Sequence, residues 1–364
     1  MKKCKILFIL QNFEGGGAER VFIHIANGFF EGGHEVSFLL GEKKGVYFDL
    51  LNPGIPVSAL NAFSLLGYLR KLPKALRTNH FTHVFTASDN ISIATLVVKN
   101  FIRNKPIVIC TLHFNLQTML SLLPWGNRQW VKWSNRNIIA GADKLVAVSK
   151  GVETGFRAGT GKKVPQLMTI YNPVFDAGIY AKAAEPVTGG IFNRNKRTLI
   201  TVGRLIRQKN QQCMLRAFSK IYQHDQNLQL IIMGIGPLET ELKQLTADLQ
   251  LQDAVHFLGF QKNPFSYLQK SDLFVLSSLF EGLPTVIIES LALGINVVST
   301  NCNSGPSEIL EEGKLGWLSR VDDPDDLAKK IVLALEHPKL KDDLIKAAQR
   351  YNNKLNVGHY LSIL

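Results

Sequence analysis

Two glutamates, Glu281 and Glu289, flank a stretch that could bind a ligand rich in hydroxyl groups. The stretch reads EGLPTVIIE, and its Gly282 and Pro284 are typical of a turn that leads into a helix. Apolar residues then spread around nearly the whole helix, so we expect Glu289 to be buried. A buried carboxylate is costly unless it is hydrogen-bonded or paired, and either sugar hydroxyls or a structural Arg or Lys would satisfy it. Glu281 precedes the helix and is better placed to contact a ligand.

Two basic residues, Arg204 and Lys209, follow the strand-like run TLITVG and precede a helical pattern. Cations at a helix start are unfavourable by about 0.3–1 kcal/mol each, unless an anion lies between them and the backbone donors. A diphosphate would supply that anion. Two solvated side chains in a surface loop are the alternative interpretation.

Glycines and one histidine mark the ends of further strand-like runs. Consecutive glycines let a backbone approach a ligand closely. The run GGG matches neither a dinucleotide fingerprint nor a phosphate-binding loop, so taken alone it favours a plain turn. His113 ends the run PIVICTLH, where it could face a cleft or be structural. The glycines concerned are Gly15, Gly16, Gly17, Gly203, Gly234, Gly236 and Gly259.

The elements that position these residues alternate between apolar strands and helical patterns. The strand-like runs are CKILFIL, HEVSFLL, THVFTAS, PIVICTLH and KLVAVS, then TLITVG, LQLIIMG, VHFLGF, DLFVLSS and NVVST. Nearly continuous apolar strands indicate parallel sheets covered by helices on both faces. The sequence therefore predicts an α/β fold with two Rossmann-like, doubly wound domains. Ligands bind such sheets at the carboxyl ends of the strands, where all the candidate residues lie.

The length of 364 residues also favours two domains. The segment with the poorest pattern, residues 172–197, contains Pro173, Pro186 and the Gly189–Gly190 pair, and we interpret it as the linker. The predicted domains are residues 1–172 and 173–344.

The net charge of +13 is concentrated in the first half of the chain. Residues 1–180 contain 21 lysines and arginines against 10 acidic residues, and the remainder contains 21 against 19. Such asymmetry indicates an anionic partner, either an acidic membrane surface or a nucleic acid, with a merely soluble basic surface as the alternative. No recognised nucleic-acid motif supports the second partner, and we predict no nucleic-acid binding.

One short segment of that basic half interleaves aromatic and cationic side chains, as interfacial helices do. A packed helix with core tryptophans is the alternative. No apolar run is long enough to span a membrane, and the four distant cysteines match neither a metal site nor a disulfide framework. We expect a cytoplasmic protein, peripheral on the inner face of the membrane. The interleaved residues are Trp125, Arg128, Trp130, Lys132, Trp133 and Arg136.

An ordered series of motifs covers nearly the whole chain: GGGAER, VGRL with Lys209 and Asn210, GIGPLE, FLGF, EGLPTVIIE and GPSEIL. This series resembles glycosyltransferase family 4, whose members have the GT-B fold of two Rossmann-like domains. The resemblance implies that the second domain binds a nucleotide-sugar donor, and that a C-terminal helix, about residues 345–364, returns to the first domain. It also implies a retaining transfer of a hexosyl or N-acetylhexosaminyl group.

The resemblance assigns a role to each candidate residue. Arg204 and Lys209 would grip the donor diphosphate, Glu289 the ribose hydroxyls and Glu281 the donor sugar, with His113 contributing from the first domain. Gly16 and Gly17 would close over the diphosphate. The remaining donor-binding residues are Gly203, Gly234, Gly236, Leu258, Gly259, Phe260, Gly282, Leu283, Pro284 and Thr285.

The resemblance also sets expectations about cofactors and partners. Asp323-Pro324-Asp325 looks like an acidic helix start rather than a metal-binding turn, so we predict a metal-independent enzyme without a cofactor. The expected substrates are a UDP-sugar and a lipid-linked or lipopolysaccharide-type glycan acceptor. A nucleotide-sugar epimerase or phosphorylase of the same fold, a basic nucleic-acid-binding protein and a non-catalytic sensor are the competing functions.

Overall fold

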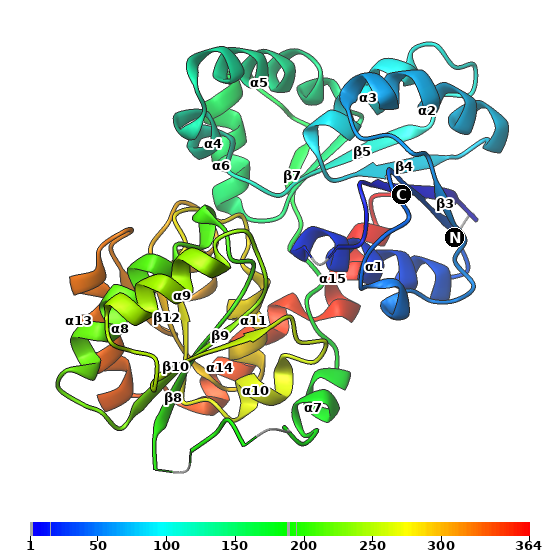
Figure 1. The fold of residues 1–364 in the computed structure, drawn as a ribbon. Coiled ribbons are helices and arrows are strands. Elements are labelled where there is room, and N and C mark those ends of the chain that lie inside the picture. Colours follow the sequence, from blue (N-terminus) through cyan, green and yellow to red (C-terminus); the bar gives the residue numbers. More distant parts are fainter. Residues whose placement is uncertain (1–2, 15, 188–189, 194) are drawn as a thin grey trace. The chain divides into compact units, whose positions relative to one another are not determined.

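The protein divides into two compact units, and the computed structural model describes residues 3–14, 16–187, 190–193 and 195–364. Unit 1 comprises Met1–Val174 and Asn353–Leu364, and unit 2 comprises Phe175–Asn352. Each unit contains one sheet covered by helices (Figure 1). The predicted α/β class with two Rossmann-like domains is therefore confirmed.

The sheet of unit 1 has seven strands in the order β3-β2-β1-β4-β5-β6-β7, and every neighbouring pair is parallel. The strand order proceeds from β1 to one edge of the sheet and then from β4 to the other edge. This reversal of the strand order beside β1 is typical of a doubly wound sheet. The strands are β1 (Lys5–Leu10), β2 (Glu35–Leu40), β3 (Val57–Ala59), β4 (His83–Thr86), β5 (Ile107–Leu112), β6 (Lys144–Ala147) and β7 (Leu167–Thr169).

Helices cover both faces of this sheet. Within the described part of unit 1 they are α1 (Gly17–Glu31), α2 (Leu65–Asn79), α3 (Asp89–Lys99), α4 (Leu116–Leu122), α5 (Trp125–Asn137), α6 (Lys150–Thr160) and α15 (Asn353–Leu361). In β1, Ile6 and Phe8 enter a core with α1 and α15, whereas Leu7 and Ile9 enter a second core with α2 and α3. Successive strand residues point to opposite faces, so an unbroken apolar strand needs both layers.

The sheet of unit 2 has six parallel strands in the order β10-β9-β8-β11-β12-β13. The strands are β8 (Arg197–Val202), β9 (Leu228–Met233), β10 (Val255–Gly259), β11 (Leu273–Leu276), β12 (Asn296–Thr300) and β13 (Trp317–Ser319). The predicted strands TLITVG and DLFVLSS correspond to β8 and β11. These two strands are direct neighbours.

The helices of unit 2 begin and end at residues that the sequence marks. Asp323 caps α13, with Pro324 at its first position, and Gly294 follows α11 with a positive φ of 71°. The helices are α7 (Gly178–Ala183), α8 (Gln211–Tyr222), α9 (Glu239–Asp248), α10 (Phe265–Gln269), α11 (Thr285–Ala292), α12 (Pro306–Ile309), α13 (Pro324–Glu336) and α14 (Lys341–Ala348).

The boundaries of the two units differ from the predicted ones. The chain leaves unit 1 after Val174, two residues later than predicted, and returns only at Asn353, whereas the returning segment was expected to start near residue 345. Arg350, which lies in the 3₁₀ turn after α14, donates from Nη2 to the backbone carbonyl of Ile309 and so joins this segment to unit 2. Only α15 and the residues after it join unit 1.

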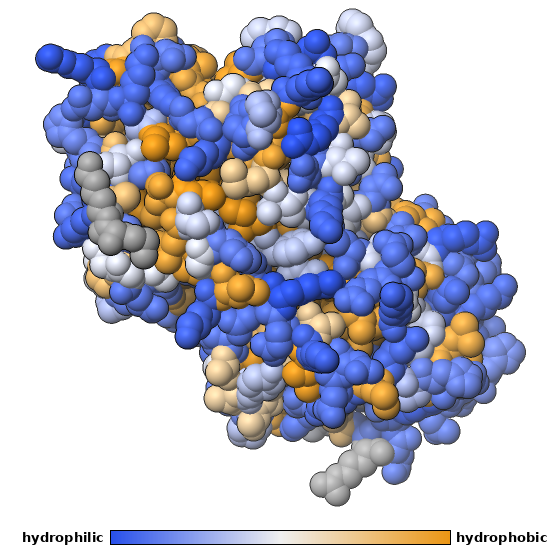
Figure 2. Space-filling view, turned by 180° about the vertical axis from the view of Figure 1, so that it is seen from behind, coloured by the Kyte–Doolittle hydropathy of each residue, from blue (hydrophilic) through white to orange (hydrophobic). Residues whose placement is uncertain are grey.

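The structure also bears on the expectations about membrane-spanning segments, cysteines and the surface. Among the described residues, no helix is long and apolar enough to cross a membrane. The four cysteines are thiols outside any disulfide bond. Hydrophilic residues cover much of the face drawn in Figure 2, and apolar residues gather in patches between them.

Candidate functional site

The carboxyl edge of the unit 2 sheet brings Lys209 and Glu281 together. Lys209 Nζ lies 2.5 Å from Glu281 Oε1, and the two side chains are only 19% and 7% exposed. Lys209 ends a 3₁₀ turn, Arg207–Lys209, that follows β8, and Glu281 follows β11. Because β8 and β11 are parallel neighbours, their following loops meet at one edge. Lys209 is thus paired rather than solvated in a surface loop.

Hydrogen bonds join the loop after β8 to the loop after β11. Ser277 Oγ donates to the Lys209 carbonyl at 2.8 Å, and the Leu279 backbone N–H donates to the Gln208 carbonyl at 2.8 Å. Gln208 Nε2 donates to the Phe280 carbonyl at 2.9 Å. These bonds fix the main chain on both sides of the ion pair, so the two side chains extend from fixed backbone positions.

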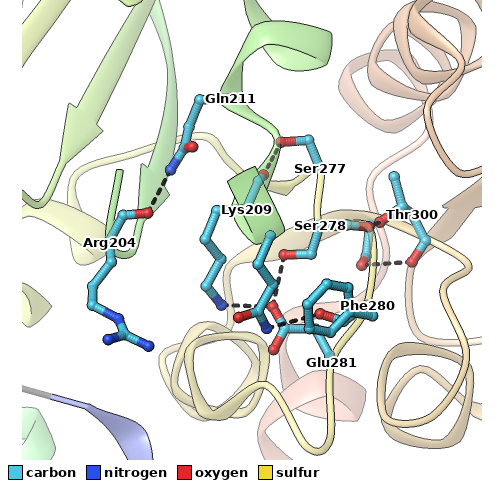
Figure 3. A network of polar contacts seen from close by, with 10 residues as sticks. Arg204, Lys209, Gln211, Ser277, Ser278, Phe280, Glu281 and Thr300 are labelled. Carbon is cyan, nitrogen blue, oxygen red and sulfur yellow. Dashed lines mark hydrogen bonds and ion pairs between the residues drawn. The ribbon is translucent and has the colours of Figure 1, made fainter. Parts of the chain in front are cut away.

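Arg204 extends from the same loop with an exposed side chain. Its carbonyl accepts a 3.0 Å hydrogen bond from Gln211 Nε2, which anchors the backbone and leaves the guanidinium to project outward. In Figure 3 the side chains of Arg204 and Lys209 extend in the same direction. Of the cations in this loop, Arg204 is exposed and Lys209 is paired with Glu281.

Gly234 and Gly236, predicted to border a ligand, are required by close backbone packing. Gly234 has a φ of +134°, and a Cβ there would lie 1.9 Å from the Gly203 carbonyl oxygen. A Cβ at Gly236 would lie 2.3 Å from the Leu205 carbonyl oxygen. The loop after β9 thus supports the loop that carries Arg204. At Gly203 a Cβ would make only ordinary contacts, the nearest at 3.4 Å with Lys209.

The predicted turn before α11 is confirmed, with Pro284 preceding the first helical residue, Thr285. Gly282, Leu283 and Pro284 are buried. Gly305 presses against this turn with a φ of +89°, and a Cβ there would come within 2.5 Å of Pro284 Cδ. The turn therefore has one well-defined shape, and the first backbone N–H groups of α11 end at the same sheet edge as the ion pair.

Glu289 lies on α11 and is 1% exposed, as predicted from its apolar neighbours. Ile287, Ile288 and Leu291 of the same helix are fully buried. A carboxylate in such surroundings depends on nearby donors for its stability. Its assignment to ribose hydroxyls stays a prediction.

The residues predicted to border a base lie at the end of the edge strand β10. Gly259 has a φ of +64°, and its carbonyl accepts a 2.8 Å hydrogen bond from the Gly234 backbone. Leu258 is half-buried and Phe260 is 42% exposed. An exposed aromatic ring beside a supported turn is suited to stacking on a planar ligand.

The predicted residues of unit 1 also lie at a carboxyl sheet edge. Gly16 is the N-cap residue of α1 and Gly17 is its first residue, whereas Gly15 lies outside the described residues. His113 directly follows β5, with its Nε2 2.9 Å from Thr111 Oγ1. Burial lowers the pKa of His113 to about 4, so the imidazole is neutral at pH 7. Their contact with a ligand stays a prediction.

Helix α5 exposes the tryptophans of the segment predicted to dock at an interface. Trp125 is 75% exposed, and Trp130 and Trp133 are about half exposed, with their rings stacked at a centroid distance of 5.5 Å. The helix contains Arg128, Lys132 and Arg136 and no acidic residue. The alternative of core tryptophans is therefore wrong.

The Asp323-Pro324-Asp325 segment is an acidic helix start, as predicted. Asp323 Oδ1 accepts a 2.9 Å hydrogen bond from the Asp326 backbone N–H, and this bond lowers the pKa of Asp323. In the part of the chain that the structure describes, no group of three His, Cys, Asp or Glu residues could hold a metal ion. Metal independence stays a prediction.

Sequence reasoning missed two residues of this site, Ser278 and Thr300. Ser278 Oγ donates to Glu281 Oε1 at 2.6 Å, and Thr300 Oγ1 donates to the Ser278 carbonyl at 2.6 Å. Both residues lie at carboxyl strand ends, after β11 and at the end of β12. That position was the one available signal, because serine and threonine are common at strand ends for structural reasons.

Two family models match this chain. Residues 15–176 match the model described as "Glycosyltransferase Family 4", and residues 190–351 match "Glycosyl transferases group 1". The first segment falls almost entirely in unit 1 and the second entirely in unit 2. Lys209, Glu281 and Glu289 all lie in the second matched segment.

Two relatives come from Campylobacter jejuni. One is named N-acetylgalactosamine-N,N'-diacetylbacillosaminyl-diphospho-undecaprenol 4-alpha-N-acetylgalactosaminyltransferase, and it is 34% identical over 47% of this chain and 45% of its own length. The other, named GalNAc-alpha-(1->4)-GalNAc-alpha-(1->3)-diNAcBac-PP-undecaprenol alpha-1,4-N-acetyl-D-galactosaminyltransferase, is 25% identical over 98% of this chain and 95% of its own length. Five relatives at least 30% identical match over only 27% to 45% of their own length.

A solved structure with the same fold is Anabaena HepE in complex with UDP and glucose. It superposes with a TM-score of 0.82 at 23% identity, and the match covers 99% of this chain and 100% of that chain. At this identity the likeness concerns the fold.

Proposed function

Because this chain belongs to glycosyltransferase family 4 and has the GT-B fold, we propose that it transfers a hexosyl or N-acetylhexosaminyl group from a UDP-sugar to a lipid-linked glycan, with retention of the anomeric configuration. The observation that carries the proposal is the ion pair of Lys209 and Glu281, beside the exposed Arg204, at the carboxyl edge of unit 2. Cations suit a diphosphate and a carboxylate suits sugar hydroxyls, so one edge offers both halves of a donor site.

The chemistry follows from those charges. The bond between the sugar C1 and the diphosphate oxygen breaks, and its electron pair leaves with the phosphate. Arg204 and Lys209 stabilise that growing negative charge, as preorganised cations do at other leaving groups. The acceptor oxygen bonds to C1 on the same face, and its proton passes to the departing phosphate. Glu281 holds the sugar and Glu289 the ribose.

Metal independence is part of this proposal. In transfer to or from a diphosphate, a metal ion commonly neutralises the leaving group. Here Arg204 and Lys209 supply two positive charges at the edge where the diphosphate would lie. Activity of the purified enzyme should therefore survive treatment with EDTA. A loss of activity that Mg²⁺ or Mn²⁺ restores would contradict it.

The substrate class draws support from the relatives. Both Campylobacter jejuni relatives are named for transfer to undecaprenol-linked acceptors, and HepE was crystallised with UDP. A thermal-shift panel of UDP-, GDP- and ADP-sugars tests the donor directly. A ligand at 100 times its dissociation constant adds about 2.7 kcal/mol of apparent stability. Stabilisation by GDP- or ADP-sugars alone would overturn the UDP assignment.

Product analysis then separates transfer from the competing reactions. A transferase releases free UDP and yields a lengthened acceptor. An epimerase yields an isomeric UDP-sugar without free UDP, and a phosphorylase needs inorganic phosphate as the second substrate. Undecaprenyl-diphosphate-linked glycans are the acceptors to supply first.

The proposal includes peripheral association with the inner face of the cytoplasmic membrane through unit 1. The support is α5, which combines three exposed tryptophans with three basic residues and lacks acidic ones. Tryptophan rings favour the headgroup region, and cations are attracted to anionic lipid by about 1 kcal/mol each near the surface. A lipid-linked acceptor would be within reach of an enzyme held there.

A further inference from the structure

Ser278 occupies a fully buried position between β11 and Glu281. Its hydroxyl donates to Glu281 Oε1 at 2.6 Å, the same oxygen that receives Lys209 Nζ at 2.5 Å. Figure 3 shows both donors converging on this carboxylate. Glu281 is thus held by one charged and one neutral donor.

The two donors differ in how far they can move. Lys209 carries its charge on a flexible four-carbon stem, whereas a serine hydroxyl can turn only about one bond of its short side chain. The Ser278 backbone is held in turn, because Thr300 Oγ1 donates to its carbonyl at 2.6 Å. Thr300 is fully buried at the end of β12. The serine is therefore the fixed donor and the lysine is the adaptable one.

This difference matters when an anion competes for Lys209. A diphosphate that draws the ammonium away would leave Glu281, which is 6% exposed, as a buried carboxylate without its cation. Such a group keeps its position only if another donor remains. Ser278 is such a donor, since its bond to Oε1 does not involve the lysine.

We infer that Ser278 is a positioning residue: it holds the Glu281 carboxylate oriented toward the donor sugar while Lys209 engages the diphosphate. The inference rests on the proposed function. It gives Ser278 a specific role, although serine is a common residue at strand ends. Lys209 and Ser278 contact the same oxygen of Glu281, but they have different roles. The lysine responds to the nucleotide, and the serine keeps the sugar-binding group in place.

The test compares Ser278→Ala with Ser278→Thr, which keeps the hydroxyl, and with the control Ser271→Ala. Ser271 is also a buried serine of unit 2, and its hydroxyl donates to the Tyr267 carbonyl at 2.8 Å, away from Glu281. The probes are UDP and whichever of UDP-glucose, UDP-N-acetylglucosamine and UDP-N-acetylgalactosamine stabilises the wild-type protein most. The measurements are the dissociation constant of UDP and the rate of UDP release from the UDP-sugar.

For Ser278→Ala we expect the rate of UDP release to fall roughly tenfold or more, because a hydrogen bond to a charged group is lost. The dissociation constant of UDP should change less than about threefold. Ser278→Thr should restore most of the rate, and Ser271→Ala should behave like the wild type. Equal loss of UDP binding and of rate, or no loss of either, would overturn the inference.

A second variant keeps the test decisive if Ser278→Ala does not fold. Thr300→Val removes the hydroxyl that holds the Ser278 carbonyl and preserves the side-chain shape. We expect a smaller loss of rate with UDP binding retained, and an unchanged rate would overturn the inference. If the wild-type protein binds no nucleotide sugar at all, the proposed function fails, whatever the serine variants do.

Discussion

The carboxyl edges of the two sheets are built from different chemistry. In unit 2, charged side chains of neighbouring loops pair with one another, and hydrogen bonds from Ser277, Ser278 and Gln208 fix the pair. The edge of unit 1 carries the glycines that begin α1 and a histidine kept neutral by burial. Two doubly wound sheets thus differ at their carboxyl edges. One edge carries an ion pair, and the predicted residues at the other edge carry no charge. The charged edge suits the diphosphate of the proposed donor.

The largest expected effect comes from breaking the charged edge. Lys209→Ala should lower the rate of UDP release from a UDP-sugar by roughly a hundredfold or more, because removing one preorganised charge at a leaving group costs that much. It also leaves Glu281 buried without its cation. Steady-state kinetics of the folded variant measure the effect.

The matched control for Lys209→Ala is Lys243→Ala. Lys243 also forms an ion pair, with Glu239 on the exposed face of α9, at 2.7 Å. Its loss should leave the rate unchanged. Equal activity of the two variants would show that the ion pair at the sheet edge has no special role.

The second effect concerns Glu289, which we propose for the ribose hydroxyls, whereas Glu281 is proposed for the donor sugar. Glu289→Gln should weaken UDP binding roughly tenfold, since a charge-assisted hydrogen bond becomes a neutral one. Calorimetric titration with UDP measures it, and Glu239→Gln on α9 serves as the exposed control. Retention of wild-type UDP affinity by Glu289→Gln would remove Glu289 from the proposed ribose site.

The third effect belongs to unit 1 and should leave nucleotide binding untouched. Replacing Trp130 and Trp133 by Ala should reduce binding to vesicles with anionic lipid roughly tenfold, because two interfacial aromatic side chains are lost. Flotation measures it. Phe101→Ala, which alters an exposed aromatic residue outside α5, is the control. Vesicle binding that ignores both the lipid charge and the tryptophans would sink the membrane proposal.

The last effect is on stability rather than on activity or binding, and it concerns the neutral histidine. Between pH 6.5 and about 4 the unfolded chain binds a proton at His113 and the folded protein does not, so the free energy of unfolding falls as the pH falls through this range. Above pH 6.5 His113 is mainly neutral in both the folded and the unfolded chain, so the loss of stability that it causes at lower pH is absent. His113→Gln should lose less stability than the wild type between pH 7 and pH 4.5, by up to about 3 kcal/mol.

Melting temperatures across that pH range check the histidine prediction. His359→Gln, which alters an exposed histidine of unit 1, is the control and should follow the wild type. An identical pH dependence in His113→Gln would show that folding does not lower the pKa of His113.

Local patterns predicted the elements well, because each depends on neighbouring residues. Pro284 and Gly294 marked the limits of α11, and its unbroken apolar circumference predicted the burial of Glu289. Local sequence patterns could not predict the bond between Lys209 and Glu281. The residues are 72 positions apart, and only the adjacency of β8 and β11 brings them together.

Long-range packing also explains features that local patterns do not announce. The contact of Gly234 and Gly236 with a ligand stays a prediction, and the structure adds a requirement from the backbone of the neighbouring loop. The return to unit 1 was placed near residue 345, because helical patterns alone do not say which core a helix joins. Arg350 reaches back to the end of α12, and that long-range contact decides the boundary.

The placement of α15 has a consequence for synthesis of the protein. Its Val357 and Tyr360, with the following Ile363, fill the same core as β1 and α1, although all of unit 2 separates them in the chain. A ribosome therefore finishes unit 2 before it releases the residues that complete the core of unit 1. A truncation after residue 352 would therefore expose the core of unit 1 while leaving the ion pair of Lys209 and Glu281 in unit 2 intact.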